Sequence, residues 1–410
     1  MNVKPKHLGF NCSDFESFVT GNHIYVDKTK IIYELITASD RAHFYFVSRP
    51  RRFGKSLFIS TLKEIYAGRK ELFAEYWIGK HSDYEWPKHP VIHLDFSGID
   101  HSSVEEFKTS LCFNLQIIAT QYGIQHIGGT NPGDMLRALV IELSKQGKVV
   151  LLVDEYDKPL VHHLDNLPLA EECRKILSNF YTTVKSLSSN WHAIFITGVS
   201  KFAKTSLFSG LNNLKELSFD SRAAELFGYT YADLSTYFST YIDTLAIQME
   251  QTKEETLAQM KEWYNGYRFC DDMQKPQMYN PFSVTACLDD MKFANYWFNT
   301  GNPGFLIQLL RKRGLGLELP DTLIQASFHS LNALDINNIP LYTLLAQTGY
   351  LTIVDYDTSS ATFMLDYPNR EVRESFKYYL MQANQMYMSK DPESERIARE
   401  MAEVDKKNRS

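Results

Sequence analysis

The sequence predicts an α/β protein built on a parallel sheet, and three observations lead to this fold class. Short apolar runs typical of buried strands alternate with segments of helical period through the first half of the chain. A loop that ends in Gly-Lys-Ser follows the first such run and precedes a helical segment. A later apolar run ends in two adjacent carboxylates, Asp154 and Glu155. Strands that alternate with helices pair in parallel, because each crossover helix returns the chain to the same end of the sheet.

The expected elements of this sheet follow one another in a regular order. The strands are predicted at 43–47, 91–96, 148–153 and 193–197, with a short fifth strand at 214–219. The helices are predicted at 29–38, 57–66, 104–119, 135–145 and 170–187, with a strand-like run at 24–26 and a glycine-rich loop at 121–133. Continuous apolar strands of this kind indicate a sheet that is covered on both faces.

The pattern changes after about residue 225, where helical segments replace the alternation. These helices are predicted at 231–241, 256–264, 305–311 and 341–348. Runs at 350–354 and 361–365 flank a polar turn, which is typical of a β-hairpin, and helices followed by a hairpin suggest a winged-helix-like module. The chain is therefore divided into an N-terminal lead-in (1–40), a core (41–225), a helical lid (226–300), a winged-helix-like region (301–387) and a charge-dense tail (388–410).

The loop that follows the first strand has the architecture of a nucleotide phosphate cradle, a P-loop. Backbone N–H groups of the loop and of the next helix N-terminus would face the phosphates, where the helix dipole favours negative charge. Lys55 would reach the β- and γ-phosphates, and Ser56 would hold Mg²⁺. Arg49 stands where the usual loop begins with glycine, so the run is either an unusual phosphate loop or a chance Gly-Lys-Ser. The loop residues expected to contact the nucleotide are Arg52, Phe53, Gly54, Lys55, Ser56 and Leu57.

The two carboxylates stand at the tip of a buried strand, in the crevice where open α/β sheets bind ligands. Asp154 would bind Mg²⁺ directly or through its waters, and Glu155 would polarise the attacking water as a general base. The alternative is an ordinary acidic turn that ends the strand. A phosphate cradle and a metal-binding acid need each other, so the two motifs together favour a nucleotide site over either alternative.

Two further residues are candidates for this site, each with a structural alternative. A chain with a glutamate beside the metal-binding aspartate carries an additional strand between the phosphate-loop strand and the acidic strand. Thr197, at the tip of the predicted strand 193–197, would orient water against the γ-phosphate, with Ser200 as the second candidate and a plain strand end as the alternative. Tyr25 either stacks on the base or packs in the core.

The basic residues leave more alternatives open. Arg49, Arg51 and Arg52 would contact phosphates, stiffen the loop, or face a partner subunit as arginine fingers. Arg268, in the helical region, either senses the γ-phosphate from a lid or is structural. Two histidines, His162 and His163, have no acidic or cysteine partner at metal spacing and are expected to be structural. Two lysines, Lys201 and Lys204, form a basic loop that faces nucleic acid or solvent.

Composition excludes several classes of protein. The 410 residues carry a formal charge of −6, which does not indicate a general binder of polyanions. The sequence has no apolar run of the roughly 18 residues that a membrane helix needs, and its first residues lack a signal-peptide core. The five cysteines are scattered without a Cys-x-x-Cys pair, which argues for reduced thiols and a cytoplasmic location.

Taken in order, these motifs resemble the bacterial AAA-ATPase-like family. The stretches that carry the resemblance are 25–29, 49–56, 153–159, 197–202 and 209–214, followed by 264–269 and 279–283. Their order and spacing match the family over about residues 5–225, and the arginine at position 49 is usual in it. The resemblance implies a P-loop ATPase core with an additional strand, and it implies ATP as the nucleotide.

Family members commonly continue into a restriction-endonuclease-like nuclease domain with a Glu-x-Lys pair. Here Glu374 and Lys377 are one residue too far apart for that pair, so the chain is expected to be a truncated or nuclease-less member without nuclease activity. The function expected first is Mg²⁺-dependent ATP hydrolysis that drives or gates a conformational change, on DNA or on a protein partner. The alternative is a nucleotide-bound switch or interaction module that does not hydrolyse, with the C-terminal region as the partner-binding part. A homo-oligomer is compatible with both.

Overall fold

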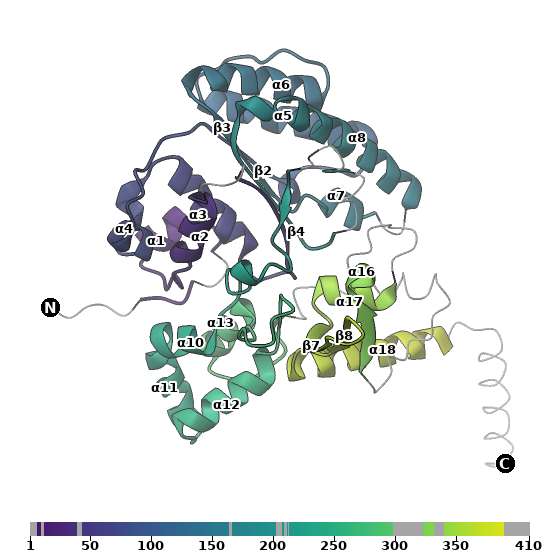
Figure 1. Ribbon diagram of the computed structural model, residues 1–410. Helices are drawn as coiled ribbons and strands as arrows, with labels where there is room; N and C mark the ends of the chain where they lie inside the picture. The colour runs from purple at the N-terminus through teal and green to yellow at the C-terminus, as the bar shows by residue number, and fades with distance from the viewer. Residues whose placement is uncertain are drawn as a thin grey trace, which may run out of the picture.

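A central sheet of five parallel strands organises the first half of the chain (Figure 1). The computed structural model describes residues 6–9, 12–38, 43–163, 166–201, 207–208, 211, 213–297, 323–331 and 340–388. The strands are β1 (His43–Ser48), β2 (Val91–Asp95), β3 (Val149–Asp154), β4 (Trp191–Gly198) and β5 (Lys215–Glu216). They lie in the order β2-β3-β4-β1-β5, so the predicted α/β fold class and parallel sheet are confirmed.

Strand β4 lies between β1 and β3, although it follows both of them in the sequence. Ser48 at the end of β1 pairs with Gly198 at the end of β4, and Val153 of β3 pairs with Ile196. Because all three strands run in the same direction, the loops that follow them leave the sheet side by side at one edge. This edge holds the predicted phosphate loop, the acidic turn and Thr197.

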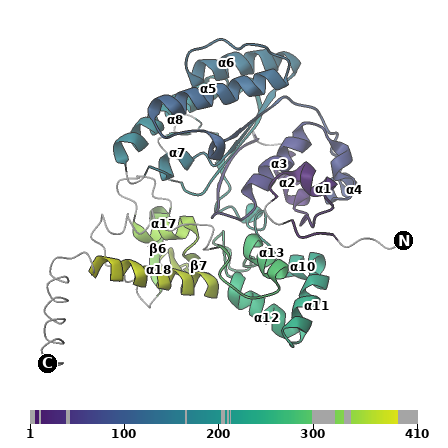
Figure 2. The same cartoon turned by 180° about the vertical axis from the view of Figure 1, so that it is seen from behind.

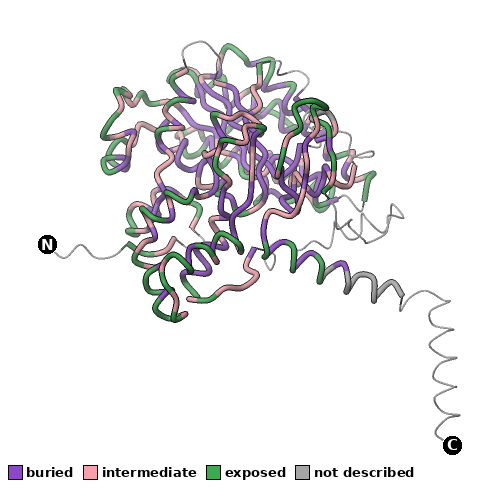
Figure 3. The backbone as a smooth tube through the Cα atoms, turned by 60° about the horizontal axis from the view of Figure 1, so that its bottom comes forward, coloured by how far each residue is buried: buried purple, intermediate pink, exposed green. Residues whose placement is uncertain are grey.

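Helices cover both faces of the sheet, and alternation along β1 shows how the core is divided. Phe44 and Phe46 pack with α5 (Val104–Gln121), α6 (Pro132–Leu143) and α8 (Leu167–Ser186) on one face. Tyr45 and Val47 point to the other face, toward α2 (Thr29–Ile36) and α3 (Lys55–Tyr66). Figure 1 shows these two helical layers on opposite sides of the strands, and Figure 3 shows that the buried residues gather in the interior of the molecule.

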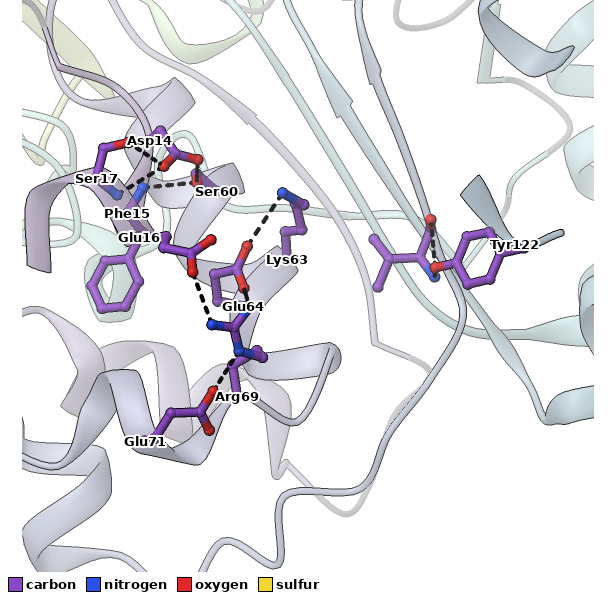
Figure 4. Close-up of polar contacts among 11 residues, drawn as sticks. Asp14, Phe15, Glu16, Ser17, Ser60, Lys63, Glu64, Arg69, Glu71 and Tyr122 are labelled. Carbon is purple, nitrogen blue, oxygen red and sulfur yellow. Dashed lines mark hydrogen bonds and ion pairs between the residues drawn. The ribbon is translucent and has the colours of Figure 1, made fainter. Parts of the chain in front are cut away.

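The N-terminal segment is fastened to the outside of α3 by polar contacts (Figure 4). Asp14 caps α1 (Phe15–Thr20) by accepting from the Ser17 N–H, and the Ser60 hydroxyl donates to its other oxygen at 3.2 Å. The Phe15 N–H donates to that same hydroxyl oxygen at 2.9 Å. Arg69, just beyond the end of α3, pairs with Glu16 at 2.8 Å. The N-terminal segment, which contributes one wall of the cavity described below, is thereby held in place.

Short elements complete the first half. They are η1 (Lys70–Phe73), α4 (Trp77–His81), η2 (Phe96–Gly98), η3 (Ser144–Gln146), α7 (Lys158–Val161), η4 (Ser188–Asn190) and η5 (Ser221–Ala223).

The second half contains two groups of elements that lie below the edge of the sheet in Figures 1 and 2. The first group is α10 (Tyr231–Tyr237), α11 (Ser239–Gln248), α12 (Lys253–Tyr264) and α13 (Pro281–Asp290). The second, called here the C-terminal group, is β6 (Ile324–Ser327), α16 (Phe328–Leu331), α17 (Leu341–Thr348), β7 (Thr352–Asp357), β8 (Thr362–Asp366) and α18 (Arg370–Met388). Its strands form an antiparallel sheet in the order β6-β8-β7.

Several sequence predictions about local structure need correction. Residues 24–26 form no strand, since they line a cavity as irregular chain. The helix predicted at 231–241 is two helices that meet at Phe238, where the backbone departs from helical geometry with φ −116° and ψ 7°. The predicted hairpin is present as β7 and β8, and the third strand β6 was not predicted. The helix predicted at 305–311 and nearly all of the tail at 388–410 lie outside the described residues, and the winged-helix-like module stays a prediction.

Two further findings concern membrane-spanning helices and the state of the cysteines. In the described ranges, no helix combines the length and the apolar character that crossing a bilayer requires. All five cysteines lie within those ranges and are free thiols.

Candidate functional site

A cavity of about 460 Å³ opens at the edge of the sheet where β1 and β3 end. All seven residues predicted to contact a nucleotide line it: the six loop residues from Arg52 to Leu57, and Tyr25. Glu155 and Lys158 reach it from the turn after β3. The described residues around it carry five positive charges, on Lys28, Arg51, Arg52, Lys55 and Lys158, and one negative charge, on Glu155. Such an excess of positive charge suits a polyanionic ligand.

Backbone conformation shapes the loop where it meets α3. Gly54 precedes the helix with φ +89°, a left-handed conformation that suits glycine, and a Cβ there would meet nothing within 4 Å. Arg52 also has positive φ, at +71°. These two reversals bring the loop across the start of α3, whose first N–H groups have no partner within the helix.

Lys55 begins α3 and is buried beneath the loop. Its Nζ donates to the carbonyl oxygens of Arg49 and Pro50, each at 3.0 Å, and so holds the loop in a curve. Burial lowers the pKa of Lys55, while the nearby charges of Asp154, Glu155 and Asp157 oppose this shift. The lysine therefore ties the phosphate loop electrostatically to the acidic turn.

Asp154 ends β3 as a buried carboxylate with both of its hydrogen bonds on one oxygen. The Thr197 hydroxyl donates to Oδ1, and so does the Glu155 N–H at 3.0 Å. The structure thus brings Thr197 from the tip of β4 to Asp154, but Thr197 is not among the residues that line the cavity. Its side chain contacts the aspartate instead of the cavity, and its predicted role toward water stays a prediction.

Glu155 adopts φ +50°, a left-handed conformation that is unusual for a residue with a side chain. This reversal turns Glu155 out of the strand direction and places it on the cavity wall. Burial raises the pKa of Glu155, and the charges of Lys55 and Lys158 oppose that rise. A carboxylate with restricted solvation beside a cationic pocket is a candidate general base.

Asp157 and Tyr156 are residues whose part in the site the sequence analysis missed. The buried Asp157 carboxylate accepts from the Ser200 N–H at 2.7 Å, from the Ser200 hydroxyl at 2.6 Å and from the Val199 N–H at 3.2 Å. The Tyr156 hydroxyl donates to the Ser200 carbonyl at 3.1 Å. The sequence signal for this role was the further acid, Asp157, two positions after Glu155. Asp157 attaches the acidic turn to the tip of β4, and Ser200, the second candidate for orienting water, is thereby an anchor of that turn.

Arg49 is buried and directed away from the cavity. Its Nη1 donates to the carbonyls of Ser48 and Ser218 at 3.0 and 2.8 Å, and its Nη2 to the Ala223 carbonyl at 3.3 Å. The guanidinium lies over the Phe269 ring at 4.2 Å. Burial lowers the pKa of Arg49 to about 9. Of the roles left open for this arginine, the geometry supports loop stiffening.

The other loop arginines lie differently. Arg51 and Arg52 line the cavity, and Arg52 stacks over the Phe282 ring at 4.7 Å. Arg268 donates to the carbonyls of Asp272 and Lys275 at 3.1 and 2.7 Å and is not a cavity residue, which agrees with its structural alternative. Phosphate contact therefore remains open for Arg51 and Arg52.

Tyr25 is packed in the core, which is the structural one of its two alternatives. Its ring packs edge-on against Phe15 and Tyr76, with ring centroids 5.0 Å away in each case, and its hydroxyl lies 3.4 Å from the Thr61 hydroxyl. Burial raises its pKa. The side chain is only 6% exposed, so Tyr25 is a core residue whose edge forms part of the cavity wall.

Of the two lysines predicted after β4, the structure describes only Lys201, and Lys201 does not match either expectation. Lys201 is buried. It forms an ion pair with Glu216, and its ammonium lies 4.0 Å from the centre of the Phe219 ring. It faces neither solvent nor nucleic acid. Lys204 lies outside the described residues.

The two neighbouring histidines are placed beyond the acidic turn. His163 is buried with Nε2 2.7 Å from the His101 carbonyl, and His162 packs edge-on to the His101 ring. In the described ranges, no group of three histidine, cysteine or acidic side chains is arranged to hold a metal ion.

Comparison with known proteins places the chain in a family. Residues 9–208 match a family model described as a predicted AAA-ATPase, of the AAA-ATPase-like type. The chain is also similar to an uncharacterized protein of the vnfD 5′ region from Azotobacter chroococcum mcd 1. The two are 35% identical over 389 residues, which cover 92% of this chain and 70% of that protein. The family match includes β1 to β4, the phosphate loop and the acidic turn, and the chain belongs to the AAA-ATPase-like family.

Proposed function

We propose that the protein binds ATP with Mg²⁺ in the 460 Å³ cavity and hydrolyses it, so that ATP turnover drives or gates a conformational change. One observation carries the proposal: the Gly-Lys-Ser loop and Glu155, about 100 residues apart in the sequence, line the same cavity. The family assignment supports ATP-type chemistry.

The phosphates would lie on the loop and the first turn of α3, where unpaired N–H groups and the helix dipole attract negative charge. Lys55 would contact the β- and γ-phosphates by exchanging its bonds to the Arg49 and Pro50 carbonyls for phosphate oxygens. Arg51 and Arg52 add positive charge at the same wall. The nucleoside would lie toward the apolar part of the cavity, beside Tyr25.

Asp154 at the end of β3 and Ser56 at the start of α3 carry the kind of oxygens that would hold Mg²⁺; Ser56 lines the cavity, and Asp154 lies behind its wall next to Glu155. Magnesium prefers a few carboxylate and hydroxyl oxygens together with waters and phosphate. Oδ2 of Asp154 accepts no hydrogen bond from the part of the chain that the structure describes, because Thr197 and the Glu155 N–H both bind Oδ1. Ser56 would supply the second protein oxygen. When bound, the ion would neutralise phosphate charge.

Glu155 would act as the general base on the water that attacks the γ-phosphorus. The water oxygen forms a bond to phosphorus, Glu155 accepts the released proton, and the bond to the β–γ bridging oxygen breaks. ADP leaves with that electron pair, and the γ-group becomes inorganic phosphate. Thr197 would serve as a positioning residue for Asp154.

A steady-state phosphate-release assay tests this function. Wild type is expected to release phosphate with Mg²⁺, alone or with DNA, whereas Glu155→Gln should lose turnover and keep ATP binding. Lys55→Ala should abolish ATP binding, with Lys145→Ala as control, because Lys145 is an exposed lysine paired with Glu142 on the far side of the sheet. Unchanged ATP affinity in Lys55→Ala, or ATP binding by wild type without turnover, contradicts hydrolysis at this site.

A second function for the C-terminal group is supported by its antiparallel sheet and by its contacts with the loops of the site. We propose that this winged-helix-like region binds DNA or a protein partner, as it would in a nucleotide-bound switch. For DNA, a titration at several salt concentrations should show affinity for duplex that falls as salt rises. The absence of such affinity removes DNA from the proposal.

A further inference from the structure

Lys158 lies beside Glu155 on the wall of the cavity. The turn after β3 places it there, because the Lys158 N–H donates to the Glu155 carbonyl at 2.9 Å and Lys158 begins α7. Its Nζ lies 3.8 Å from Oε2 of Glu155, and the two side chains are 31% and 27% exposed. An ion pair that is this long and this accessible contributes little, so Lys158 can change partner at low cost.

The backbone beneath this pair is fixed, in contrast to the pair itself. Asp157, between the two residues, binds Val199 and Ser200 through three hydrogen-bond donors. The turn therefore stays attached to the tip of β4 while the lysine side chain is free to rotate. Two other cations of the cavity already have closer partners: Lys55 contacts two carbonyl oxygens at 3.0 Å, and Lys28 pairs with Asp233 at 2.6 Å.

A terminal phosphate entering the cavity creates an electrostatic conflict at this pair. The phosphate carries about two negative charges near pH 7 and would approach the Glu155 carboxylate, which repels it. A cation that can leave Glu155 for the phosphate resolves the conflict. Lys158 is the side chain in position to do so.

We infer that Lys158 binds the terminal phosphate of ATP and in doing so releases Glu155, so that the general base becomes unpaired only when a γ-phosphate is present. This inference rests on the proposed ATPase function. ADP lacks the γ-phosphate and leaves the Lys158–Glu155 pair in place. Lys158 is then the residue through which the site distinguishes ATP from ADP.

The test compares nucleotide affinities by titration calorimetry with Mg²⁺, using ADP and the β,γ-imido analogue of ATP. Lys158→Met keeps the length of the side chain and removes its charge, and it is expected to weaken the analogue about 10-fold or more while ADP affinity stays within twofold. Lys158→Arg should restore most of the difference. Lys175→Met is the matched control, because Lys175 forms the same i,i+3 lysine–glutamate pair with Glu172 on α8, away from the cavity.

A double-mutant cycle with Glu155→Gln tests the exchange of partners. Glu155→Gln should tighten binding of the analogue in the background of wild type, and the gain should be larger when Lys158 is already Met, because no cation then offsets the repulsion between Glu155 and the phosphate. Equal loss of ADP and analogue affinity in Lys158→Met, or no loss of either, overturns the inference while ATP hydrolysis by wild type stands. Failure of wild type to bind either nucleotide overturns both.

Discussion

At the scale of single residues, the site depends on side chains that orient other side chains. Thr197 illustrates this, because its hydroxyl donates to Oδ1 of Asp154, whereas Oδ2 accepts no hydrogen bond within the described part of the chain. Replacing Thr197 by Val keeps the β-branched shape in the buried strand and removes only this donor. The aspartate would then retain the Glu155 N–H as its hydrogen-bond donor and would rotate more freely.

We therefore expect Thr197→Val to lower kcat about 10-fold and to raise the Mg²⁺ concentration needed for half-maximal turnover. Phosphate release measured across a series of Mg²⁺ concentrations gives both quantities. Thr197→Ser retains the hydroxyl and should remain close to wild type. An unchanged Mg²⁺ requirement in Thr197→Val would show that the hydroxyl does not act through the aspartate.

Residue identity could be predicted here, but side-chain direction could not. The sequence brought Lys55, Ser56, Asp154 and Glu155 to one end of a parallel sheet, because strand ends are fixed by the order of apolar runs. The direction of Arg49 depends on Ser218, Ala223 and Phe269, which follow it by more than 160 residues. No local pattern in the sequence reports contacts of that range.

At the scale of elements, Arg49 makes the phosphate loop different from one that begins with glycine. Its guanidinium joins the end of β1 to the segment after β5 through three carbonyl oxygens. Arg49→Gly would restore the residue that is usual at this position in other phosphate loops. It would also leave three buried carbonyls without this donor and make the unfolded chain more flexible.

We expect Arg49→Gly to lower the free energy of unfolding by roughly 3 kcal/mol and to leave ATP affinity no better than that of wild type. Thermal or urea unfolding measures the first effect, and calorimetric titration measures the second. Arg52→Gly, at the exposed position with positive φ, is the comparison and should change stability little. A gain in ATP affinity without loss of stability in Arg49→Gly would contradict the structural role of Arg49.

Helix α18 is joined to α13 and to Trp297 by a buried acid, Glu371. Its Oε1 accepts from the Trp297 N–H at 2.6 Å, and its Oε2 from the Ser283 hydroxyl of α13 at 2.7 Å. Burial raises the pKa of Glu371 from 4.5 to about 7, and the hydrogen bonds to Ser283 and to the backbone N–H groups of Trp297 and Tyr296 oppose the rise. The folded state therefore binds a proton at Glu371 more tightly than the unfolded state does.

This difference in proton binding sets the sign with which the free energy of unfolding depends on pH. The contribution of Glu371 to stability is fully present below about pH 4.5 and is lost as pH rises to about 7. Glu371→Gln mimics the protonated acid, and the Ser283 hydroxyl can turn to accept from its amide. We expect this variant to be more stable than wild type at pH 8, with a much smaller difference at pH 4, as measured by unfolding at both values. A variant that is less stable at pH 8 would contradict a raised pKa.

At the scale of the whole molecule, the second half of the chain contacts the phosphate loop and the segment that follows β4. The Trp297 indole N–H donates to the Arg51 carbonyl at 3.0 Å. The Lys201 N–H, after β4, donates to the Gln347 side chain of α17 at 3.0 Å. A Cβ on Gly349 would come within 2.7 Å of the Pro50 ring. The sequence predicted the α/β core and the hairpin, but not these contacts, because loop-to-loop packing leaves no periodic pattern.

These contacts couple the C-terminal group to the phosphate loop, and Gly349→Ala tests the coupling. Gly349 has φ +92°, so alanine adds backbone strain as well as the contact with Pro50. Gly123→Ala separates the two effects, because Gly123 has φ +77° and open space around its Cβ. Both variants should lose about 1 kcal/mol of stability from strain, but only Gly349→Ala should displace the loop and weaken ATP binding several-fold. If the two variants bind ATP equally well, the C-terminal group rests against the phosphate loop without controlling it.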